Sequence, residues 1–496
     1  MEYTKSICPE CLDVIEAKIF EENDMIMMEK TCPEHGDFRE VYWSDAKLYQ
    51  KFKKFEKMGD GISNPMTKTS QGCPKDCGIC EKHKTTTLLA NIDVTNRCNM
   101  SCPICFANAK TRGLIYEPTF EQIVDMLKML RDEKPTRCFS VQFSGGEPTV
   151  RDDLPEIIRV AEEMGFVQIQ IATNGIRIAK DLDYAKRMMK AGLRTVYLSF
   201  DGISEEIYRD MRGFNAFPMK VQAIKNCRAA DIRSVDLVPT IARGINDHEI
   251  GDIIRFAADN RDVVKGVNFQ PIAFTGRIDQ ESRNQKRFTI PDLIKSVEEQ
   301  TEGQVPADAW YPVPFVVPVS RFLEKVQRRN LPEFTVHPHC GAATYAFVEN
   351  GKLIPITDFI DVEGFMGILD DASEELNGKR PKDMLVLAKV LKMIPQVVDS
   401  EKGPKDINVT KLLVNVIKDG GKEVTRQFHR NAMFLGCMHF QDPYNFDAHR
   451  VESCGVHYAT PDGRVIPFCT YNTLHRDAVE SKFLRPYESK PTAIES

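Results

Sequence analysis

The hydrophobic pattern of residues 86–300 repeats a short apolar run followed by an amphipathic stretch. "LLANIDV" (88–94) has the length and composition of a buried strand. "FEQIVDMLKMLRDE" (120–133) places apolar residues every three to four positions, as a helix does. This strand–helix pair repeats along the segment and gives six predicted strands. Because strands separated by helices run parallel, we predict an α/β fold, a partial (β/α)6 TIM-like barrel.

Two related segments stand out in the C-terminal third. "CGAATYAFVENGKLIPIT" (340–357) and "CGVHYATPDGRVIPFC" (454–469) share Cys-Gly, Tyr-Ala, a turn pair and Ile-Pro. Asn-Gly and Asp-Gly between apolar runs predict hairpins, since both turn positions need positive φ. With Cys437, the cysteines of these segments indicate a four-cysteine iron–sulfur site: Cys340, Cys437, Cys454 and Cys469.

The first 85 residues lack this periodicity and are rich in cysteine. A small segment with little apolar content needs a metal to hold its fold. We therefore predict three domains: a cysteine-rich metal-binding domain (1–85), the barrel (86–300) and a C-terminal auxiliary iron–sulfur and substrate domain (301–496).

Charge and hydropathy exclude several classes of protein. Lys and Arg number 66 against 72 Asp and Glu, and no long basic stretch is interleaved with aromatic residues, so we expect no nucleic-acid partner. No uncharged apolar run reaches the roughly 18 residues of a membrane span, and the N-terminus lacks signal-peptide features. We expect a cytoplasmic protein without a transmembrane segment.

Fifteen cysteines are unusual for a cytoplasmic chain, where thiols stay reduced. Their spacing indicates metal ligation, because most stand in tight groups. Cys138 and Cys227 stand alone among apolar or helical neighbours, and we expect both to be ordinary core residues.

"CNMSCPICF" (98–106) carries three cysteines on one loop, at Cys98, Cys102 and Cys105. A four-iron cluster normally takes four cysteines, so three leave one iron open to an external ligand. A zinc knuckle with a distant fourth ligand is the alternative for this motif alone. The later strands end in "SGGEPT", "TNG" and "SFDG", at the edge where barrel enzymes place their chemistry.

This combination resembles the radical S-adenosylmethionine (SAM) superfamily over roughly residues 86–275. The resemblance implies that the three cysteines hold a [4Fe-4S] cluster whose open iron is chelated by SAM. Gly145, Gly146 and Glu147 would contact the SAM amino group. Asn174, Ser199 and Asp201 would hold its carboxylate or ribose. Cleavage of SAM would give a 5′-deoxyadenosyl radical that abstracts hydrogen, and an external electron donor is required. Ile104 departs from the aromatic residue that many members have before the third cysteine, so adenine stacking is expected to differ.

The whole chain further resembles the archaeal tetraether lipid synthases, a group formerly classed as radical SAM pterin methyltransferases. That resemblance implies carbon–carbon coupling between terminal methyl carbons of the isoprenoid chains of an archaeol phospholipid, with peripheral membrane contact. The alternative is methyl transfer to a dihydro-hydroxymethylpterin precursor, which predicts a polar pocket and a one-carbon donor. A peptide-modifying maturase and a non-catalytic electron carrier are weaker alternatives.

The remaining cysteines leave one question of ligands open. The resemblance implies a rubredoxin-like mononuclear iron and a second auxiliary [4Fe-4S] cluster, which together need eight ligands. Six cysteines remain for them: Cys8, Cys11, Cys32, Cys73, Cys77 and Cys80. His35 can complete a site with the first three, a set that also suits zinc. Alternatively the six divide differently and recruit Cys138 or Cys227.

Overall fold

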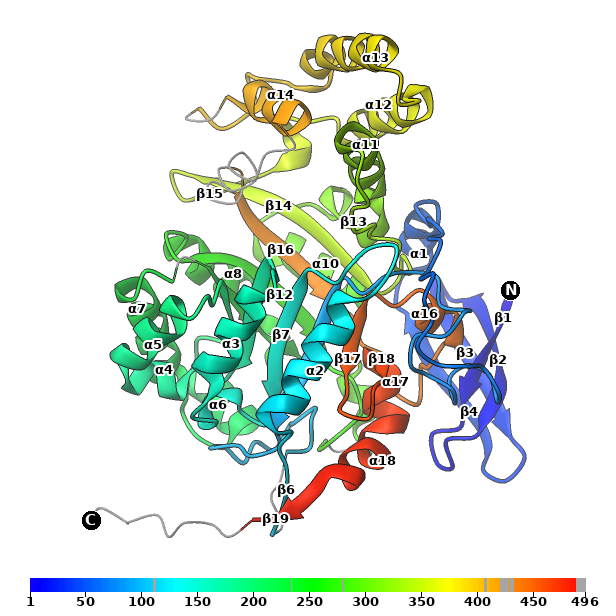
Figure 1. Cartoon of the computed structure of the whole chain (residues 1–496), viewed down its shortest axis with the longest axis vertical. Helices are drawn as coiled ribbons and strands as arrows, with labels where there is room; N and C mark the ends of the chain where they lie inside the picture. The colour runs from blue at the N-terminus through cyan, green and yellow to red at the C-terminus, as the bar shows by residue number, and fades with distance from the viewer. Residues whose placement is uncertain are drawn as a thin grey trace.

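The computed structural model describes residues 1–109, 113–232, 234–278, 281–405, 408–419, 428 and 432–487. The chain begins with a four-stranded antiparallel sheet and one helix, which lie beside the main body (Figure 1). These elements are β1 (Glu2–Ile7), β2 (Val14–Glu22), β3 (Met25–Cys32), β4 (Gly36–Trp43) and α1 (Ala46–Lys53).

Six parallel strands form the centre of the molecule, and each pairs with the next in the order of the sequence. They are β5 (Leu89–Thr95), β7 (Ser140–Gly145), β8 (Gln168–Thr173), β9 (Thr195–Ser199), β10 (Val235–Val238) and β12 (Val264–Pro271). The main covering helices are α2 (Phe120–Arg131), α3 (Leu154–Glu163), α4 (Ile176–Lys180), α5 (Leu182–Lys190), α6 (Glu205–Arg212), α7 (Phe217–Ala229) and α8 (Ile250–Asp259). The predicted partial (β/α)6 barrel is confirmed.

Alternate strand residues face opposite sides of this sheet. Ile92, Phe143 and Ile171 are fully buried in the main apolar core, which they share with the helices outside. Their neighbours in sequence point inward and are polar, as Asn91 and Gln142 show. The barrel therefore has an apolar outside and a polar inside.

Strands from the C-terminal third extend the same sheet at both edges. β16 (Ala432–Met438) runs parallel to β12, and β17 (Val456–Ala459) runs parallel to β5. The flanking and short strands are β6 (Leu114–Tyr116), β11 (Thr240–Ile241), β13 (Tyr311–Pro312), β14 (Gly341–Glu349), β15 (Lys352–Pro355), β18 (Val465–Pro467) and β19 (Leu484–Pro486). The predicted domain boundary at residue 300 remains a prediction from sequence. Strands from both sides of this boundary belong to one sheet.

Both repeated segments form the predicted hairpins. β14 and β15 are joined by Asn350 and Gly351, whose φ values are 51° and 77°. β17 and β18 are joined by a longer turn in which Gly463 has a φ of 83°. Positive φ at these turn residues is the property for which Asn and Gly are suited.

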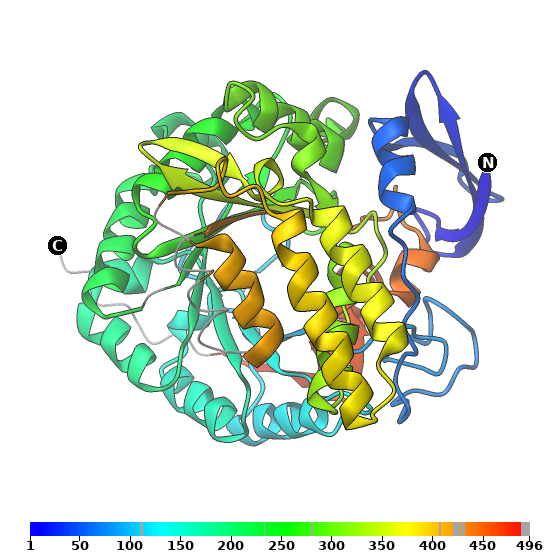
Figure 2. The ribbon, with the colours of Figure 1, turned by 90° about the horizontal axis from the view of Figure 1, so that it is seen from above.

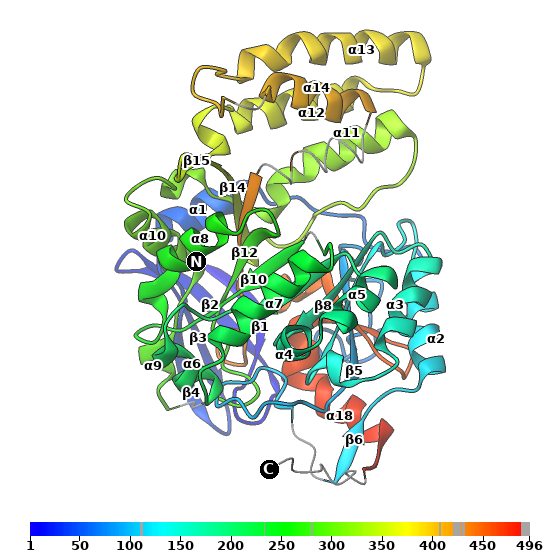
Figure 3. The ribbon, with the colours of Figure 1, turned by 90° about the vertical axis from the view of Figure 1, so that its left-hand side faces the viewer.

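Four helices lie at the end of the barrel away from β6 and β19 (Figures 1 and 3). They are α11 (Val317–Gln327), α12 (Val362–Glu375), α13 (Arg380–Met393) and α14 (Val409–Asp419). Figure 2 shows the last three lying roughly side by side above the barrel. The remaining helices are α9 (Arg283–Lys286), α10 (Ile290–Gln300), α16 (Ala448–Glu452), α17 (Phe468–Thr470) and α18 (Arg476–Glu480). Among the described residues, no helix combines the length and apolar character that crossing a membrane requires.

Candidate functional site

The three-cysteine loop follows β5 and is fastened to the segment after β12, across the mouth of the barrel. The backbone groups of Cys105 and Arg277 exchange two hydrogen bonds, of 3.0 and 2.9 Å. The Arg277 guanidinium also donates to the carbonyl of Cys102 at 2.7 Å. A Cβ atom at Gly276 would lie 2.3 Å from the carbonyl oxygen of Phe106, so glycine is required for this approach. Sequence reasoning missed this segment, because it lies far from the loop along the chain.

The thiols of Cys98, Cys102 and Cys105 are partly exposed at this mouth. Burial raises the pKa of Cys98 to about 12, with further contributions from Glu147 and the two neighbouring thiols. Metal binding offsets the free-energy cost of ionising a buried thiol, because iron binds the thiolate form. Three convergent, half-buried thiols on one loop therefore fit a cluster with one open iron.

The two glycines of "SGGEPT" pack directly against the strand that leads into the cysteine loop. A Cβ atom at Gly145 would lie 2.0 Å from the carbonyl oxygen of Thr95. One at Gly146 would lie 2.3 Å from that of Arg97, and Gly145 has a φ of 131°. No L side chain fits either position, so these glycines set the distance between β7 and the loop.

The predicted contact of Glu147 with the SAM amino group stays a prediction, and the structure shows a second set of contacts for this carboxylate. Glu147 is 1% exposed and accepts hydrogen bonds from the backbone and hydroxyl of Thr149, the hydroxyl of Thr173 and the backbone of Asn174. Because these donors lie at or just after the ends of both strands, the carboxylate joins the ends of β7 and β8. It is a positioning group in this structure.

The predicted contact of Asp201 with the SAM carboxylate or ribose also stays a prediction. Asp201 is fully buried, and both its oxygens accept hydrogen bonds from Arg212, each at 2.6 Å. Arg212 in turn donates to the carbonyl of Ile104 within the cysteine loop, at 3.1 Å. Asp201 therefore holds Arg212 against the loop.

Asn174 and Ser199 lie where the sequence predicts, at the mouth beside the cysteine loop. The side-chain amide of Asn174 donates to Asn99 at 2.7 Å. Lys220 joins the two segments, since its ammonium donates to the Asn174 carbonyl at 2.7 Å and to the Ser199 hydroxyl at 3.2 Å. Lys220 was missed, although its place on the apolar face of α7, three positions before Ala223, is a visible signal.

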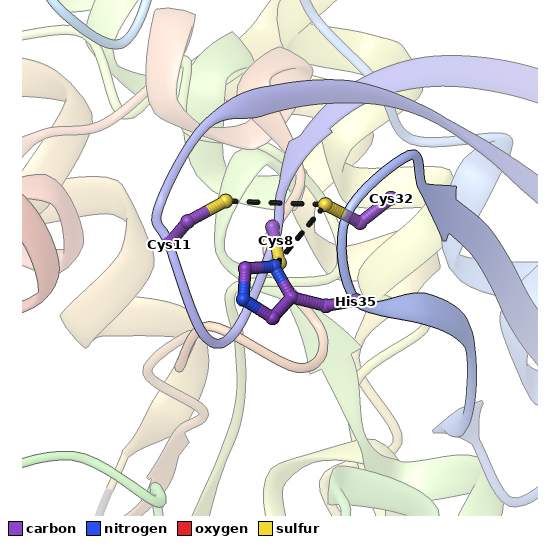
Figure 4. Close-up of side chains that lie close together, drawn as sticks. All are labelled: Cys8, Cys11, Cys32 and His35. Carbon is purple, nitrogen blue, oxygen red and sulfur yellow. Dashed lines mark hydrogen bonds between the residues drawn. The ribbon is translucent and has the colours of Figure 1, made fainter.

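A second site lies in the N-terminal sheet (Figure 4). One ligand atom from each of Cys8, Cys11, Cys32 and His35 lies within 4.8 Å of all the others. The first two follow β1, and the other two flank the turn between β3 and β4. Although burial opposes it, backbone N–H groups of Cys11 and Glu10 lower the pKa of Cys8, which favours the ligating thiolate. Three thiolates and one imidazole suit tetrahedral zinc.

A third group gathers cysteines near α16. Arg450 Nε donates to Cys340 Sγ at 3.3 Å, and the backbone of Gln441 donates to Cys469 Sγ at 3.3 Å. Burial, with Cys469 and Cys340 as neighbours, raises the pKa of Cys454. The structure thus brings three of the four predicted ligands together.

Cys437 does not join these three, which corrects the predicted four-cysteine set. Its side chain lies in the main core on β16, and burial alone raises its pKa, with no contribution from another thiol. Cys469 belongs to a different apolar cluster.

The remaining cysteines fall into two kinds. Cys73 and Cys77 are neighbours, and the Cys77 thiol, together with burial, raises the pKa of Cys73. Both pack in the apolar cluster that contains Cys469, whereas Cys80 lies at an isolated bridge to Thr67. Cys138 and Cys227 are buried in the main core, as predicted.

Comparison with known proteins matches two parts of the chain to family models. Residues 92–257 match the radical SAM superfamily, and residues 1–44 match the HMPTM N-terminal zinc ribbon domain. Among solved structures, the Streptococcus suis protein SuiB bound to S-adenosylmethionine is 18% identical, with a TM-score of 0.37, over 44% of this chain and 48% of that one.

Two named relatives differ in how much of the chain they match. The 7,8-dihydro-6-hydroxymethylpterin dimethyltransferase of Methanocaldococcus jannaschii is 52% identical over 98% of this chain and 96% of its own length. The GTP 3′,8-cyclase of Clostridium acetobutylicum is 27% identical over 44% of this chain and 66% of its own.

The first of these relatives overturns one expectation from sequence. Coupling of isoprenoid chains on an archaeol phospholipid is contradicted, because a relative that matches nearly the whole chain is a pterin dimethyltransferase by name. The sequence motifs on which the lipid prediction was based indicate radical chemistry, and they do not distinguish between substrates.

Proposed function

Because the chain belongs to the radical SAM superfamily and to the family of its Methanocaldococcus jannaschii relative, we propose that it methylates a dihydro-hydroxymethylpterin. The similarity over 98% of the chain carries this proposal, since it spans the barrel and both flanking regions. The methyl carbon comes from a one-carbon donor.

The inside of the barrel supports a polar heterocycle as substrate. Side chains of three adjacent strands form a chain of amide hydrogen bonds: Gln142 donates to Asn91 at 2.6 Å, and Gln170 donates to Gln142 at 2.6 Å. Amide groups in fixed positions recognise the ring nitrogens and the oxo group of a pterin by hydrogen bonds. A pterin can exchange further hydrogen bonds with these amides, whereas an alkyl chain offers them neither a donor nor an acceptor.

A second polar group lies on β9, β10 and β12. The Tyr197 hydroxyl accepts hydrogen bonds from Asn268 at 2.7 Å and from Gln270 at 3.0 Å. Asp236 lies opposite Tyr197 in the strand register and is partly exposed. Burial alone raises the pKa of Asp236 to about 7, with no cation or donor beside it among the described residues. A carboxylate of this kind suits the amino group and ring N–H of a pterin.

Tyr197 stands two positions before Ser199 on β9, so the two side chains point the same way, about 7 Å apart along the strand. The proposed pterin site is therefore one layer deeper in the barrel than the segments predicted to hold SAM. A cluster held by Cys98, Cys102 and Cys105 would, with SAM bound, supply a carbon radical for hydrogen abstraction. The barrel walls keep water from that radical.

The test is an anaerobic incubation of the reconstituted protein with SAM, a strong reductant, a dihydro-hydroxymethylpterin and a one-carbon donor. Mass spectrometry is expected to find 5′-deoxyadenosine and a pterin heavier by one or two methyl groups. Asp236→Asn is expected to raise the KM for the pterin at least tenfold, since a hydrogen bond to a charged group contributes about 1.5–3 kcal/mol.

Glu133→Gln is the matched control, because Glu133 is also a buried carboxyl but binds Thr87 outside the barrel. Deoxyadenosine without any change in the pterin would reject the proposed substrate. An equal loss of activity in both variants would reject the assigned role of Asp236.

A further inference from the structure

His439 is a buried histidine whose two ring nitrogens have no hydrogen-bond partner among the described residues. The residue is 2% exposed and follows the last residue of β16 directly. Buried polar side chains almost always have a partner, so an imidazole with two unpaired nitrogens indicates a missing ligand. Imidazole is also among the common metal ligands of proteins.

The backbone places His439 beside Cys340. Gly341 pairs with Met438 in the antiparallel ladder between β14 and β16, and the His439 N–H donates to the Cys340 carbonyl at 3.0 Å. Residues opposite each other in such a ladder project their side chains to the same face.

Arg450 holds the two residues together. Its Nη2 donates to the His439 carbonyl at 2.7 Å, and its Nε donates to Cys340 Sγ at 3.3 Å. Arg450 is itself 1% exposed, and its remaining guanidinium nitrogen, Nη1, has no hydrogen-bond partner in the part of the chain that the structure describes. This buried cation lies next to Cys340, where it stabilises thiolate charge.

The thiols of Cys340, Cys454 and Cys469 lie together near α16, which gives three ligands where a closed four-iron cluster takes four. Cys437, the ligand expected from sequence, lies in the other apolar core. A four-iron cluster takes four protein ligands when no iron is left open, and histidine replaces cysteine in some iron–sulfur centres.

We propose that His439 is the fourth protein ligand of an iron–sulfur cluster held by Cys340, Cys454 and Cys469. A neutral nitrogen in place of a thiolate makes the cluster less negative and raises its reduction potential. The imidazole of His439, just after the C-terminal end of β16, is thus a cluster ligand. Arg450 positions both His439 and Cys340.

The experiment uses the full chain reconstituted anaerobically, with Cys98, Cys102 and Cys105 changed to alanine so that the predicted SAM cluster does not contribute. The protein is prepared with natural or nitrogen-15-labelled histidine, and the reduced cluster is examined by pulsed electron paramagnetic resonance. We expect a strong coupling to a directly bound nitrogen that changes with the label.

The variant His439→Cys is expected to keep its iron, lose this coupling and show a lower midpoint potential. Cys437→Ser, the matched control two positions earlier in the chain, is expected to keep both the coupling and the potential. Circular dichroism and zinc content of the N-terminal site confirm that each variant folds.

Absence of a nitrogen coupling in the parent protein would overturn the proposal, as would its persistence in His439→Cys. Loss of the cluster in Cys73→Ser or Cys77→Ser, with the spectrum of His439→Cys unchanged, would assign the fourth position to a thiol of the neighbouring pair instead.

Discussion

The ammonium of Lys220 lies 3.2 Å from the hydroxyl of Ser199, in a position with no solvent exposure. Its other contact is the backbone carbonyl of Asn174, at 2.7 Å. Burial lowers the pKa of Lys220 to about 8, while Asp201 opposes that shift. The lysine therefore remains charged at neutral pH and joins the two segments that the sequence assigns to SAM.

Removing this charge is expected to weaken SAM binding. Lys220→Met should reduce affinity by roughly ten- to a hundredfold, since a hydrogen bond to a charged group contributes about 1.5–3 kcal/mol. In the parent protein, affinity should fall as the pH rises through about 8, because the lysine then loses its proton. Calorimetric titration with SAM measures both effects. Lys186→Met, an exposed change on α5, is the control, and equal affinities for the two variants would contradict the role.

The buried pair of Asp201 and Arg212 is expected to determine whether the three-cysteine loop holds iron. Asp201→Asn leaves Arg212 without its carboxylate, and breaking a buried pair in this way costs about 3–5 kcal/mol. We expect lower iron content and a lower unfolding midpoint, and Arg212→Lys should not restore them, because lysine lacks the two-pronged geometry. Asp152→Asn, at an exposed ion pair, should have normal iron content. Full iron content in Asp201→Asn would show that the loop does not depend on this pair.

The N-terminal sheet is expected to unfold without its metal. Chelation should remove about one zinc per chain and disorder β1 to β4, since small zinc domains depend on their metal for folding. His35→Cys should retain zinc, and Cys32→Ala should lose it. Metal analysis and the fluorescence of Trp43, buried at the end of β4, report the outcome. Cys227→Ala serves as the control, and zinc retained by Cys32→Ala would exclude this ligand set.

Glu133 is expected to make stability depend on pH. Burial raises its pKa to about 7, above the value near 4.5 of an exposed glutamate, although Thr87 donates two hydrogen bonds to it. The protonated form is favoured in the folded state. The stability that protonated Glu133 contributes to the folded state is therefore fully present below the pKa of the unfolded chain. It is lost as the pH rises through about 7. Glu133→Gln should stabilise the protein relative to the parent more at pH 8 than at pH 5, by up to about 3 kcal/mol.

Denaturant unfolding at the two pH values measures this difference. Glu299→Gln, at an exposed glutamate on α10, is the control. A Glu133→Gln effect equal at both pH values would show that Glu133 titrates normally.

Sequence patterns predicted the features that depend on neighbours along the chain. The six strands of the barrel, the hairpin at Asn350 and Gly351, and the loop of Cys98, Cys102 and Cys105 all follow from local periodicity, turn preference or spacing. The N-terminal ligands were also within reach, because Cys8 with Cys11 and Cys32 with His35 form two closely spaced pairs along the chain. Short-range order of this kind is determined by backbone preference and by burial of one face.

Tertiary structure decided which side chains meet across long distances in the chain. Lys220 reaches Ser199, Arg212 reaches Ile104, and Arg277 reaches the cysteine loop only because the barrel closes. The register of β14 against β16 places His439, and not Cys437, beside Arg450. A buried polar side chain can bind a ligand only if protein groups leave some of its hydrogen-bonding atoms unpaired; otherwise it positions neighbouring residues. That outcome is a property of the packed interior, which no local pattern contains.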